Sequence, residues 1–585
     1  MPNPRLADAT SPYLRQHAGD PVQWYRWDAE AFAAARNRGV PIFLSSGYSA
    51  CHWCHVMQRE SFRDPETAAL LNERFVPVKV DRELRPDVDG LYMDYVVATT
   101  GHGGWPLSVF LDADLAPLLG GTYFPRESQS GLPTFAEVLH GVDEAFRAGG
   151  DALLAATQGS MAFLRDRAEP RPQGVLDRAA IDASADYLLR LADRAHGGLG
   201  DAPKFPQAPL QQFLCAYWRV NPDSEVAWTV GHSLTSMVRG GIYDQAGGGL
   251  FRYSVDTAWT TPHFEKMLYD NGMLLSTLAR AHELAESQAV RDEYAHVARQ
   301  TAAFLARELA LPTGCYAASL SADQGGVEGA AYLWSHSQLA GVLDADELAL
   351  AVLHLGADAA DPDAPGTLTR RAGREKDAER VDAVCAKLLA ARNGRPAPDL
   401  DDKLVTAWNA LAVRGLLDAG AAFGDAGMTS AGMTALGVLL ERCATPSGVL
   451  RVPDDPSLSE VRLIDDAALL VSACLTAHET TGSREWLDDA QRLHDWVLRT
   501  FADGTTLYMV PATTDLPVRP REEGDEPTPS GAAATIDNAA RLAALTGDAT
   551  YADFAREALR GFWAIADLAP EHAGRALEAA LRLAT

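Results

Sequence analysis

The chain has 585 residues, of which 47% are hydrophobic, and a formal net charge of −28. This length predicts two or three domains with large cores. The acidic balance excludes nucleic acid and anionic membranes as partners, because both favour basic surfaces. No apolar run approaches the ~18 residues of a membrane-spanning helix. Seven cysteines are too few for a disulfide scaffold of this size, and the N-terminus has no apolar signal region, so we expect a cytoplasmic protein.

Strands and helices alternate over residues 1 to about 165. Ile42, Phe43 and Leu44 have the pattern of a buried strand end. The same patterns predict a helix over 65–72, a strand over 75–81, a strand over 106–111, a hairpin-like stretch over 117–125 and a helix over 134–167. Residues 168–176 contain two prolines and a glycine, which is typical of a linker.

The motif Cys51-His52-Trp53-Cys54-His55 follows the first predicted strand and leads into a helix. The N-terminal end of a helix carries partial positive charge, so the thiol of Cys51 ionises more readily there and can attack a disulfide. Cys54 would then resolve the mixed disulfide, and an imidazolium at His52 would stabilise the Cys51 thiolate. The spacing therefore favours dithiol redox chemistry.

Other readings of the same motif stay open. The pattern C-x-x-C-H also matches a c-type haem attachment site, which needs an exported chain. Cys51, His52, Cys54 and His55 could bind zinc, although four ligands within five residues fit one tetrahedral ion poorly and no second CxxC exists. The two cysteines could also be structural. We expect no cofactor and no metal ion.

From residue 177 onward the pattern changes to alanine- and leucine-rich segments with a period of 3.6 residues. About a dozen helices without a short repeat favour an α/α toroid over a solenoid, and a plain helical bundle is the alternative. The predicted helices are 178–195, 207–219, 225–239, 266–286, 289–310, 377–392, 403–423, 428–443, 464–480, 484–500, 531–546 and 549–565. The loop over 511–530 is expected to be exposed and mobile.

Polar residues cluster where several of these helices begin. At 100° per residue, His263, Lys266 and Asp270 would lie on one face of a helix, and Asp402 and Asn409 would do so on another. Any single acid here could be a helix N-cap. We expect a shared substrate pocket at one mouth of the toroid, lined by Asp244, Tyr253, His263, Glu265, Lys266, Tyr269, Asp270, Asn271, Asp402, Lys403, Trp408, Asn409, Asp465 and Asp466. The aromatic residues among them suit a flat ligand such as a sugar, or else belong to the core.

Lysine is rare in this chain. Only six of its 51 basic residues are lysines, so a lysine kept against this bias marks a place that needs a compact ammonium. Four of the six, Lys79, Lys204, Lys266 and Lys403, fall inside the dense motifs, whereas Lys387 lies on a periodic helix outside them.

Long motifs resemble one family. They include SPYLRQHAGDPVQWYRW (11–27), GYSACHWCHVMQRESF (47–62), VKVDRELRPDVD (78–89), GGWPLSVFLDADLAPLLGGTYFP (103–125), GGLGDAPKFP (197–206), YDQAGGGLFRYSVDTAWTTPHFEKMLYDN (243–271) and DDKLVTAWNAL (401–411). They resemble the thioredoxin-like proteins of the spermatogenesis-associated type, called YyaL-like in bacteria.

This resemblance implies a thioredoxin-like α/β domain over residues 1–167 and an all-α (α/α)6 toroid over 177–585. The toroid would be like the barrels of N-acylglucosamine 2-epimerases and six-hairpin glycosidases. Pro106, after Trp105, would be the cis-proline that faces the CxxC. Thioredoxins carry a buried acid six residues before the first cysteine, and this chain departs from that pattern with Ser45.

Three functions follow from these observations. The first is thiol–disulfide exchange at Cys51 and Cys54, with a thiol or disulfide protein as partner. The second is a carbohydrate-active barrel in which His263, or the set of Asp244, Asp402 and Asp465, supplies acid–base chemistry to a small molecule. The thioredoxin-like domain would then serve docking or regulation. The third is a binding protein with little turnover.

Overall fold

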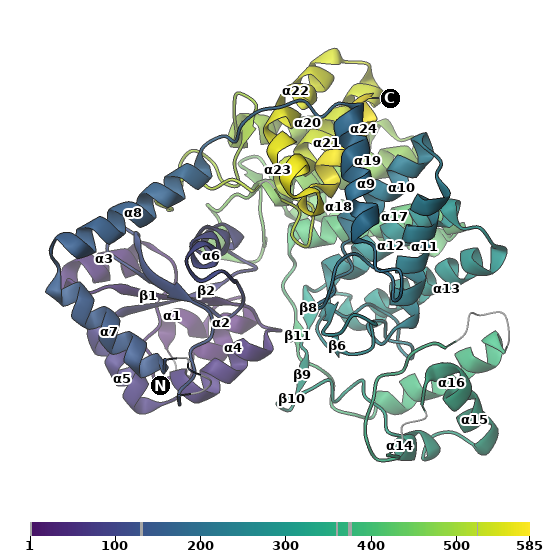
Figure 1. Ribbon diagram of the computed structural model, residues 1–585, viewed down its shortest axis with the longest axis horizontal. Coiled ribbons are helices and arrows are strands. Elements are labelled where there is room, and N and C mark those ends of the chain that lie inside the picture. The colour runs from purple at the N-terminus through teal and green to yellow at the C-terminus, as the bar shows by residue number, and fades with distance from the viewer. Residues whose placement is uncertain are drawn as a thin grey trace. The chain divides into compact units, whose positions relative to one another are not determined.

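The structure is a computed structural model that describes residues 3–128, 131, 133–357, 361–371, 377–522 and 524–584. Contacts within the chain divide it into two compact units, coloured by residue number in Figure 1. Unit 1 comprises Met1–Pro170, Arg451–Leu463 and Tyr508–Arg521. Unit 2 comprises Arg171–Leu450, Ile464–Leu507 and Glu522–Thr585. Each unit is therefore assembled from stretches that are separated in the sequence.

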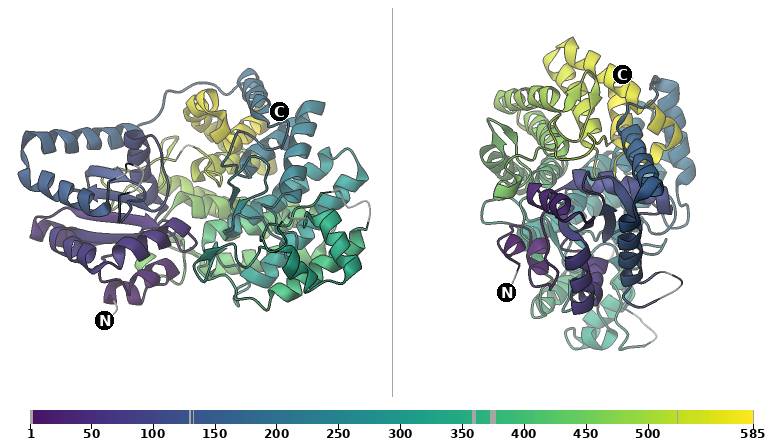
Figure 2. Two further views of the ribbon diagram at one scale, coloured as in Figure 1. Left: turned by 60° about the horizontal axis from the view of Figure 1, so that its bottom comes forward. Right: turned by 90° about the vertical axis from the view of Figure 1, so that its left-hand side faces the viewer.

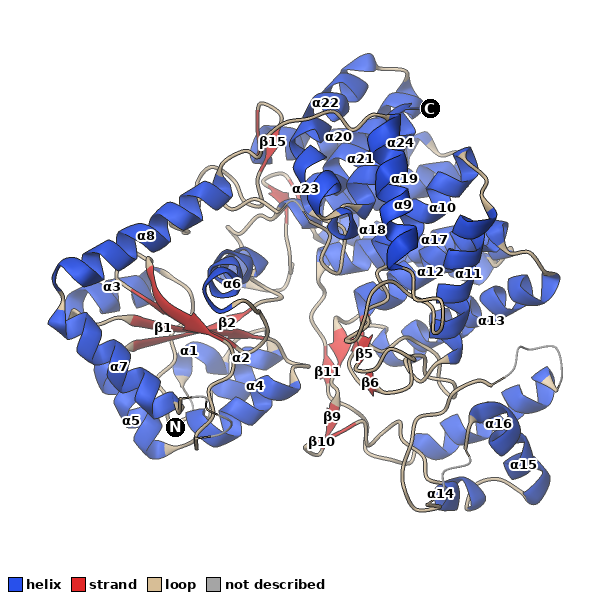
Figure 3. Cartoon of the chain, viewed as in Figure 1, coloured by secondary structure: helices blue, strands red, loops and turns tan. Residues whose placement is uncertain are grey.

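Unit 1 is built on a four-stranded sheet with the order β2-β1-β3-β4 (Figure 3). Strands β1 (Ile42–Gly47) and β2 (Val76–Asp81) are parallel. Strand β3 (Leu107–Leu111) is antiparallel to β1, and β4 (Pro117–Gly121) is antiparallel to β3. The alternation of strands and helices predicted for this part of the chain is confirmed.

Helices cover both faces of this sheet. One face carries α1 (Pro4–Ala7), α2 (Pro12–His17), α4 (His52–Met57) with the π-helix η1 (Gln58–Phe62), α5 (Pro65–Arg74) and α7 (Phe135–Ala148). The other face carries α3 (Ala29–Arg38), α6 (Pro86–Thr100) and α8 (Gly150–Ala168). The predicted helix over 134–167 is thus two helices. They separate at Gly149 and Gly150, whose φ angles of +56° and +82° suit glycine.

The alternation of side chains along the strands places two polar residues inside one core. Phe43 of β1 packs in the cluster with α2, α4 and α7, whereas its neighbours Ile42 and Leu44 pack in the cluster with α3 and α6. Ser45 lies on the same face as Phe43 and is paired in register with Lys79 of β2. Both polar side chains therefore point into the core below α4.

The two later stretches of unit 1 pack onto the domain formed by its first 170 residues. Leu516 is buried in the cluster with α3 and α6, and Arg85 forms an ion pair with Asp515 at 2.7 Å. Arg451 donates a hydrogen bond to the carbonyl of Glu83. The expectation that the loop over 511–530 is exposed is wrong at Leu516, because its side chain completes a core.

Unit 2 is mostly helical, as predicted. Six long helices contact one another in sequence, and the last of them also packs on the first, so that they form a closed ring (Figure 1). They are α10 (Ala208–Val220), α12 (Leu268–Leu284), α17 (Thr406–Phe423), α19 (Ile464–Thr481), α21 (Gly531–Thr546) and α24 (Gly574–Ala584). Helices outside the ring alternate with them along the chain: α9 (Arg178–Leu191), α11 (Ser224–Arg239), α13 (Gln288–Phe304), α18 (Ala426–Arg442), α20 (Arg484–Phe501) and α22 (Ala549–Leu559).

The N-terminal ends of the ring helices lie together. The ring of Tyr269 in α12 packs on Trp408 in α17, and the backbone N–H of Ala407 donates to Asp466 of α19 at 2.9 Å. A Cβ at Gly531 of α21 would stand 2.7 Å from the backbone nitrogen of Asp465. The backbone of Gly574 in α24 likewise lies against Pro209 of α10. Residues at the starts of these helices therefore share one end of the ring.

Short strands and helices occupy the connections of unit 2 (Figure 2). Strand β5 (Tyr253–Ser254) pairs with β6 (Pro262–His263), and β8 (Ser319–Leu320) pairs with both β7 (Lys266–Met267) and β11 (Leu400–Asp401). The others are β9 (Asp323–Gln324), β10 (Val327–Glu328), β12 (Ala444–Thr445), β13 (Gly448–Val449), β14 (Ala502–Asp503), β15 (Thr506–Leu507), α14 (His336–Ala340), α15 (Ala345–Leu355), α16 (Ala378–Arg392), α23 (Trp563–Leu568), η2 (Leu305–Leu309), η4 (Arg560–Phe562) and η5 (Pro570–His572), with η3 (Pro456–Leu458) in unit 1. Among the described residues, no helix is both long and apolar enough to cross a membrane.

Candidate functional site

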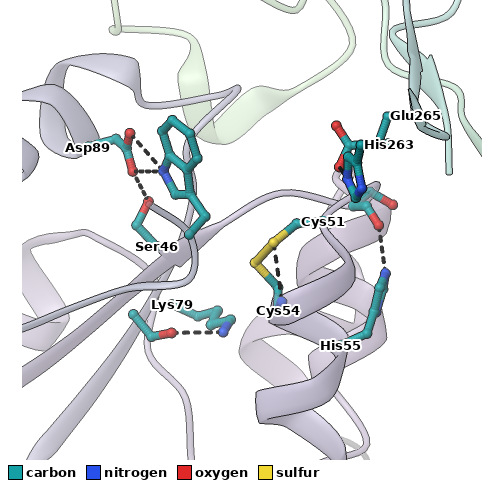
Figure 4. The surroundings of a disulfide bond; sticks show 11 residues. Ser46, Cys51, Cys54, His55, Lys79, Asp89, His263 and Glu265 are labelled. Carbon is teal, nitrogen blue, oxygen red and sulfur yellow. Dashed lines mark hydrogen bonds and ion pairs between the residues drawn. A yellow bond between two sulfur atoms is a disulfide. The ribbon is translucent and has the colours of Figure 1, made fainter. Parts of the chain in front are cut away.

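Cys51 and Cys54 are joined by a disulfide bond at the start of α4 (Figure 4). Cys51 is the N-cap residue of this helix, and its Sγ accepts a hydrogen bond from the backbone N–H of Cys54 at 3.2 Å. The side of the motif toward the core is closed, since Cys51 is 4% exposed and Cys54 is 1% exposed. The sulfur atoms therefore lie at the positive end of a helix that continues into η1.

The surface beside the disulfide is aromatic. Trp53 is 53% exposed, and its ring lies 5.1 Å from that of Tyr123 and 5.9 Å from that of His52. His55 donates from Nε2 to the carbonyl of Ser49 at 2.8 Å. An exposed tryptophan ring and two further rings therefore lie next to the disulfide.

The peptide bond between Trp105 and Pro106 is cis, as the resemblance implied. The indole of Trp105 donates to Asp89 at 3.0 Å, and the hydroxyl of Ser46 donates to the same carboxylate at 2.6 Å (Figure 4). The side chain of Asp89 on α6 therefore ties the end of β1 to the residue before Pro106.

Lys79 lies in the core on the sheet face that α4 covers, and it is 1% exposed. Its Nζ donates to Ser45 Oγ at 3.0 Å and lies 4.6 to 4.9 Å from the ring centroids of Phe62, Tyr13 and Trp24. Burial lowers the pKa of Lys79 to about 7, and the charge of Asp20 only partly opposes this. The position that carries an acid in thioredoxins is thus a serine that accepts from a buried amine.

In unit 2, His263 is bound by two carboxylates. Its Nε2 donates to Glu265 at 2.9 Å and its Nδ1 lies 2.6 Å from Glu328, while its ring stacks on Tyr253 at 5.0 Å. Burial alone would lower the pKa of His263, but the hydrogen bonds to Glu265 and Glu328 raise it to about 10. His263 is therefore held as an imidazolium and is a poor general base near neutral pH.

The predicted helix faces are wrong at their N-terminal ends. Helix α12 begins at Leu268, so His263 in β6 and Lys266 in β7 do not share a helix face with Asp270. The reason is strand pairing, since β6 pairs with β5 and β7 pairs with β8. Helix α17 likewise begins at Thr406, so Asp402, which is exposed, does not share its face.

Lys266 and Asp244 belong to a buried ion cluster. Lys266 Nζ donates to Asp244 Oδ2 at 2.7 Å and to the carbonyl of Gly248 at 2.9 Å, and Arg392 donates to the same carboxylate oxygen at 2.6 Å. Although burial opposes ionisation, the charges of Arg392 and Lys266 hold the pKa of Asp244 well below its usual range. The cluster fixes the glycine-rich turn over 244–249.

Several other predicted site residues form hydrogen bonds with backbone groups. Asn271 accepts from the N–H of Leu250 at 2.7 Å, and Asn409 accepts from that of Tyr316 at 2.8 Å. Asp466 accepts from the backbone of Ala407, as described above, and Lys403 pairs with Asp401 at 2.7 Å. Of the five lysines that the structure describes, Lys79, Lys204, Lys266 and Lys403 are at most 3% exposed, whereas the Lys387 side chain is 53% exposed.

Residues that the sequence did not single out contact the predicted ones. Arg252 lies 3.3 Å from Asp270, whose pKa burial raises to about 7 against the opposing charge of Arg252. The segment before α21 contributes Glu522, which accepts from the N–H of Gly531 at 3.5 Å. Burial, and next the charge of Asp465, raise the pKa of Glu522 to about 8. Arg252 lay inside a quoted motif, Arg392 ended a predicted periodic helix and Glu522 lay in a predicted loop, whereas Glu328 lay in a segment without any pattern.

Comparisons with known proteins agree with the motifs. Residues 3–165 match the family described as Thioredox_DsbH, protein of unknown function, DUF255. Spermatogenesis-associated protein 20 of Homo sapiens is 34% identical over 94% of this chain and 77% of its own length. The uncharacterized protein B0495.5 of Caenorhabditis elegans is 34% identical over 95% of this chain and 82% of its own length.

Among solved structures, cellobiose 2-epimerase from Bacillus thermoamylovorans has 10% identity and a TM-score of 0.43, covering 65% of this chain and 85% of its own. The relatives, in contrast, match both units at once with more than three quarters of their own length. On that evidence the chain, with a DUF255 domain in its N-terminal part, belongs to the spermatogenesis-associated protein 20 family.

Proposed function

We propose that this protein is a thiol–disulfide exchange protein, in which a thioredoxin-fold unit bearing Cys51 and Cys54 is joined to an (α/α)6 barrel. The observation that carries the proposal is the disulfide between Cys51 and Cys54 at the N-terminal end of a helix that follows the central strand β1. Such a site favours a thiolate at the first cysteine. Its partner is a protein or small molecule with a thiol or a disulfide.

The exchange starts at Cys51. A thiolate of the partner attacks Cys51 Sγ, the bond to Cys54 breaks, and its electron pair passes to Cys54 Sγ. Cys51 is the less buried of the two, at 4% against 1% exposed, and the exposed Trp53 lies two residues after it in the sequence. In the reverse direction Cys51 attacks the partner's disulfide, and Cys54 resolves the mixed disulfide.

The test uses single-cysteine variants of the full chain with oxidised glutathione as probe. Cys54→Ser should accumulate a mixed disulfide between Cys51 and glutathione, read by mass spectrometry, because the resolving thiol is gone. Cys51→Ser should accumulate much less at Cys54, and Cys215→Ser, which removes a buried cysteine of unit 2, should behave like the wild type. Equal trapping in the Cys51→Ser and Cys54→Ser variants would contradict the assigned roles.

A second candidate function concerns the barrel, and it rests on Asp465 and Glu522. Glycoside hydrolysis commonly uses one protonated and one ionised carboxyl group near neutral pH. Glu522, with a pKa raised to about 8 partly by Asp465, meets the first requirement at the shared end of the ring helices. Unit 1 would then serve docking or regulation of a small-molecule enzyme.

This second candidate is tested with a panel of reducing mono- and disaccharides followed by proton NMR. Turnover by the wild type that is lost in Glu522→Gln and retained in Glu485→Gln, an exposed position of α20, supports it. Turnover that survives Glu522→Gln, or its absence from every sugar of the panel, rejects it.

A further inference from the structure

Among the residues that the structure describes, none is a hydrogen-bond partner of the Tyr13 hydroxyl, although this hydroxyl is fully buried. Tyr13 lies on α2, is 0% exposed, and packs in the same core cluster as Cys51 and Cys54. A buried hydroxyl without a partner costs free energy, so such a group in a native core calls for an explanation.

Gly47 leaves a small space that this hydroxyl and Cys54 share. A Cβ placed on Gly47 would collide with Tyr13 Oη and would stand 2.6 Å from Cys54 Sγ. The two atoms therefore border the same volume at the end of β1. They are close to each other without a hydrogen bond while Cys54 is held in the disulfide.

We propose that Tyr13 is the hydrogen-bond donor that stabilises the Cys54 thiolate when the disulfide opens. The inference rests on the proposed exchange at Cys51. A dithiol attacks Cys51, the bond between Cys51 and Cys54 breaks, and the electron pair goes to Cys54 Sγ. The O–H of Tyr13 then turns to that sulfur and keeps its proton. The second thiolate of the dithiol next releases Cys51, so that the two electrons end on Cys51 and Cys54 and the dithiol becomes a disulfide.

In its protonated form, Lys79 favours an anionic sulfur at this place. Its Nζ lies 4.9 Å from the ring centroid of Tyr13 and donates to Ser45. The residue six positions before the first cysteine is neutral here, so no carboxylate at that position opposes a thiolate at Cys54. The Tyr13 hydroxyl and the Lys79 amine thus stabilise the Cys54 thiolate in a core that lacks the acid found in thioredoxins.

The test compares Tyr13→Phe with the wild type in both redox forms of the full chain. In the disulfide form Tyr13→Phe should melt at the same temperature or higher, because the hydroxyl has no partner there. In the reduced form it should melt lower. In glutathione buffers, with the thiols trapped by alkylation, the fraction reduced should fall, with an equilibrium shift of about tenfold for one lost hydrogen bond to a charged group.

Tyr92→Phe is the matched control. Tyr92 is also 0% exposed, but it lies in the opposite core and donates to the carbonyl of Leu115 at 3.0 Å. This variant should destabilise both redox forms equally and leave the glutathione equilibrium unchanged. Gly47→Ala, which fills the shared space, should shift the equilibrium as Tyr13→Phe does.

The outcomes separate the two proposals. A wild-type disulfide that never exchanges with glutathione overturns the proposed function and this inference with it. Normal exchange in the wild type, with an unchanged equilibrium in Tyr13→Phe, overturns the inference alone. A shift of the same size in Tyr92→Phe also overturns it, because the effect would then belong to any lost buried hydroxyl.

Discussion

Replacing Lys79 by methionine should stabilise unit 1 at low pH far more than at high pH. The folded protein lowers the pKa of this amine from 10.5 to about 7, so between these values the folded state binds fewer protons than the unfolded chain. The free energy of unfolding therefore rises with pH across this window. Below pH 7 the full cost of burying the ammonium is present, and above pH 10.5 it is absent.

The magnitude follows from the shift. At 1.36 kcal/mol per pKa unit, the cost at low pH is about 5 kcal/mol. Lys79→Met removes this cost and also a hydrogen bond to Ser45, which is worth about 1 kcal/mol. The stability gained by the variant should shrink by about 3 kcal/mol between pH 6.5 and pH 9.5. Among the groups near Lys79, His17 has a pKa lowered by burial to about 3, so it stays neutral throughout this range.

The assay is urea unfolding of the oxidised full chain at the two pH values, with a short deuterium pulse read by mass spectrometry. Peptides from β1 and β2 report unit 1 alone, which avoids treating the whole chain as one two-state unit. Lys387→Met, at an exposed position of α16, is the control and should show no pH-dependent difference. A difference between Lys79→Met and the wild type that is constant from pH 6.5 to 9.5 refutes the reasoning.

The remaining predictions concern the barrel. His263 has a pKa raised from 6.5 to about 10, so its stabilisation is complete below pH 6.5 and is lost as the pH rises through 10; thermal melts of His263→Asn should lack this loss. Asp244→Asn should cost unit 2 about 3 to 5 kcal/mol in urea unfolding, because Lys266 would remain buried and charged without its partner. Lys266→Arg and Lys403→Arg should each lower stability by about 1 to 3 kcal/mol through overpacking, whereas Lys387→Arg should stay within about 0.5 kcal/mol; equal melts of all three would contradict the burial argument.

Local patterns were sufficient to predict the strands of unit 1 and the periodic helices of unit 2, but they did not predict α3 and α6 of unit 1. Strands such as Ile42–Gly47 are short apolar runs next to turn residues, and the ring helices repeat every 3.6 residues, so both signals are local. The rarity of lysine likewise marked residues that the structure buries. These predictions succeeded because the burial of a segment determines the pattern of apolar residues within that segment alone.

The arrangement of polar groups could not be predicted in the same way. Extending helical geometry back to His263 failed because its segment pairs with β5, a contact that depends on the fold of a whole connection. Glu328 and Arg392 reach their partners from 65 or more residues away. Tyr13 stood in a quoted motif, but its lack of a partner beside Gly47 is a three-dimensional fact.

The division of unit 1 among three stretches of the chain has a consequence for synthesis on the ribosome. The domain formed by the first 170 residues lacks Leu516 from its core, and Arg85 lacks Asp515, until about 350 further residues have been made. At a translation rate of roughly 5 to 20 residues per second, that wait lasts about 20 to 70 s. During this time an apolar face beside α3 and α6 is uncovered in the nascent chain. We expect a chaperone to bind this uncovered apolar face during that interval.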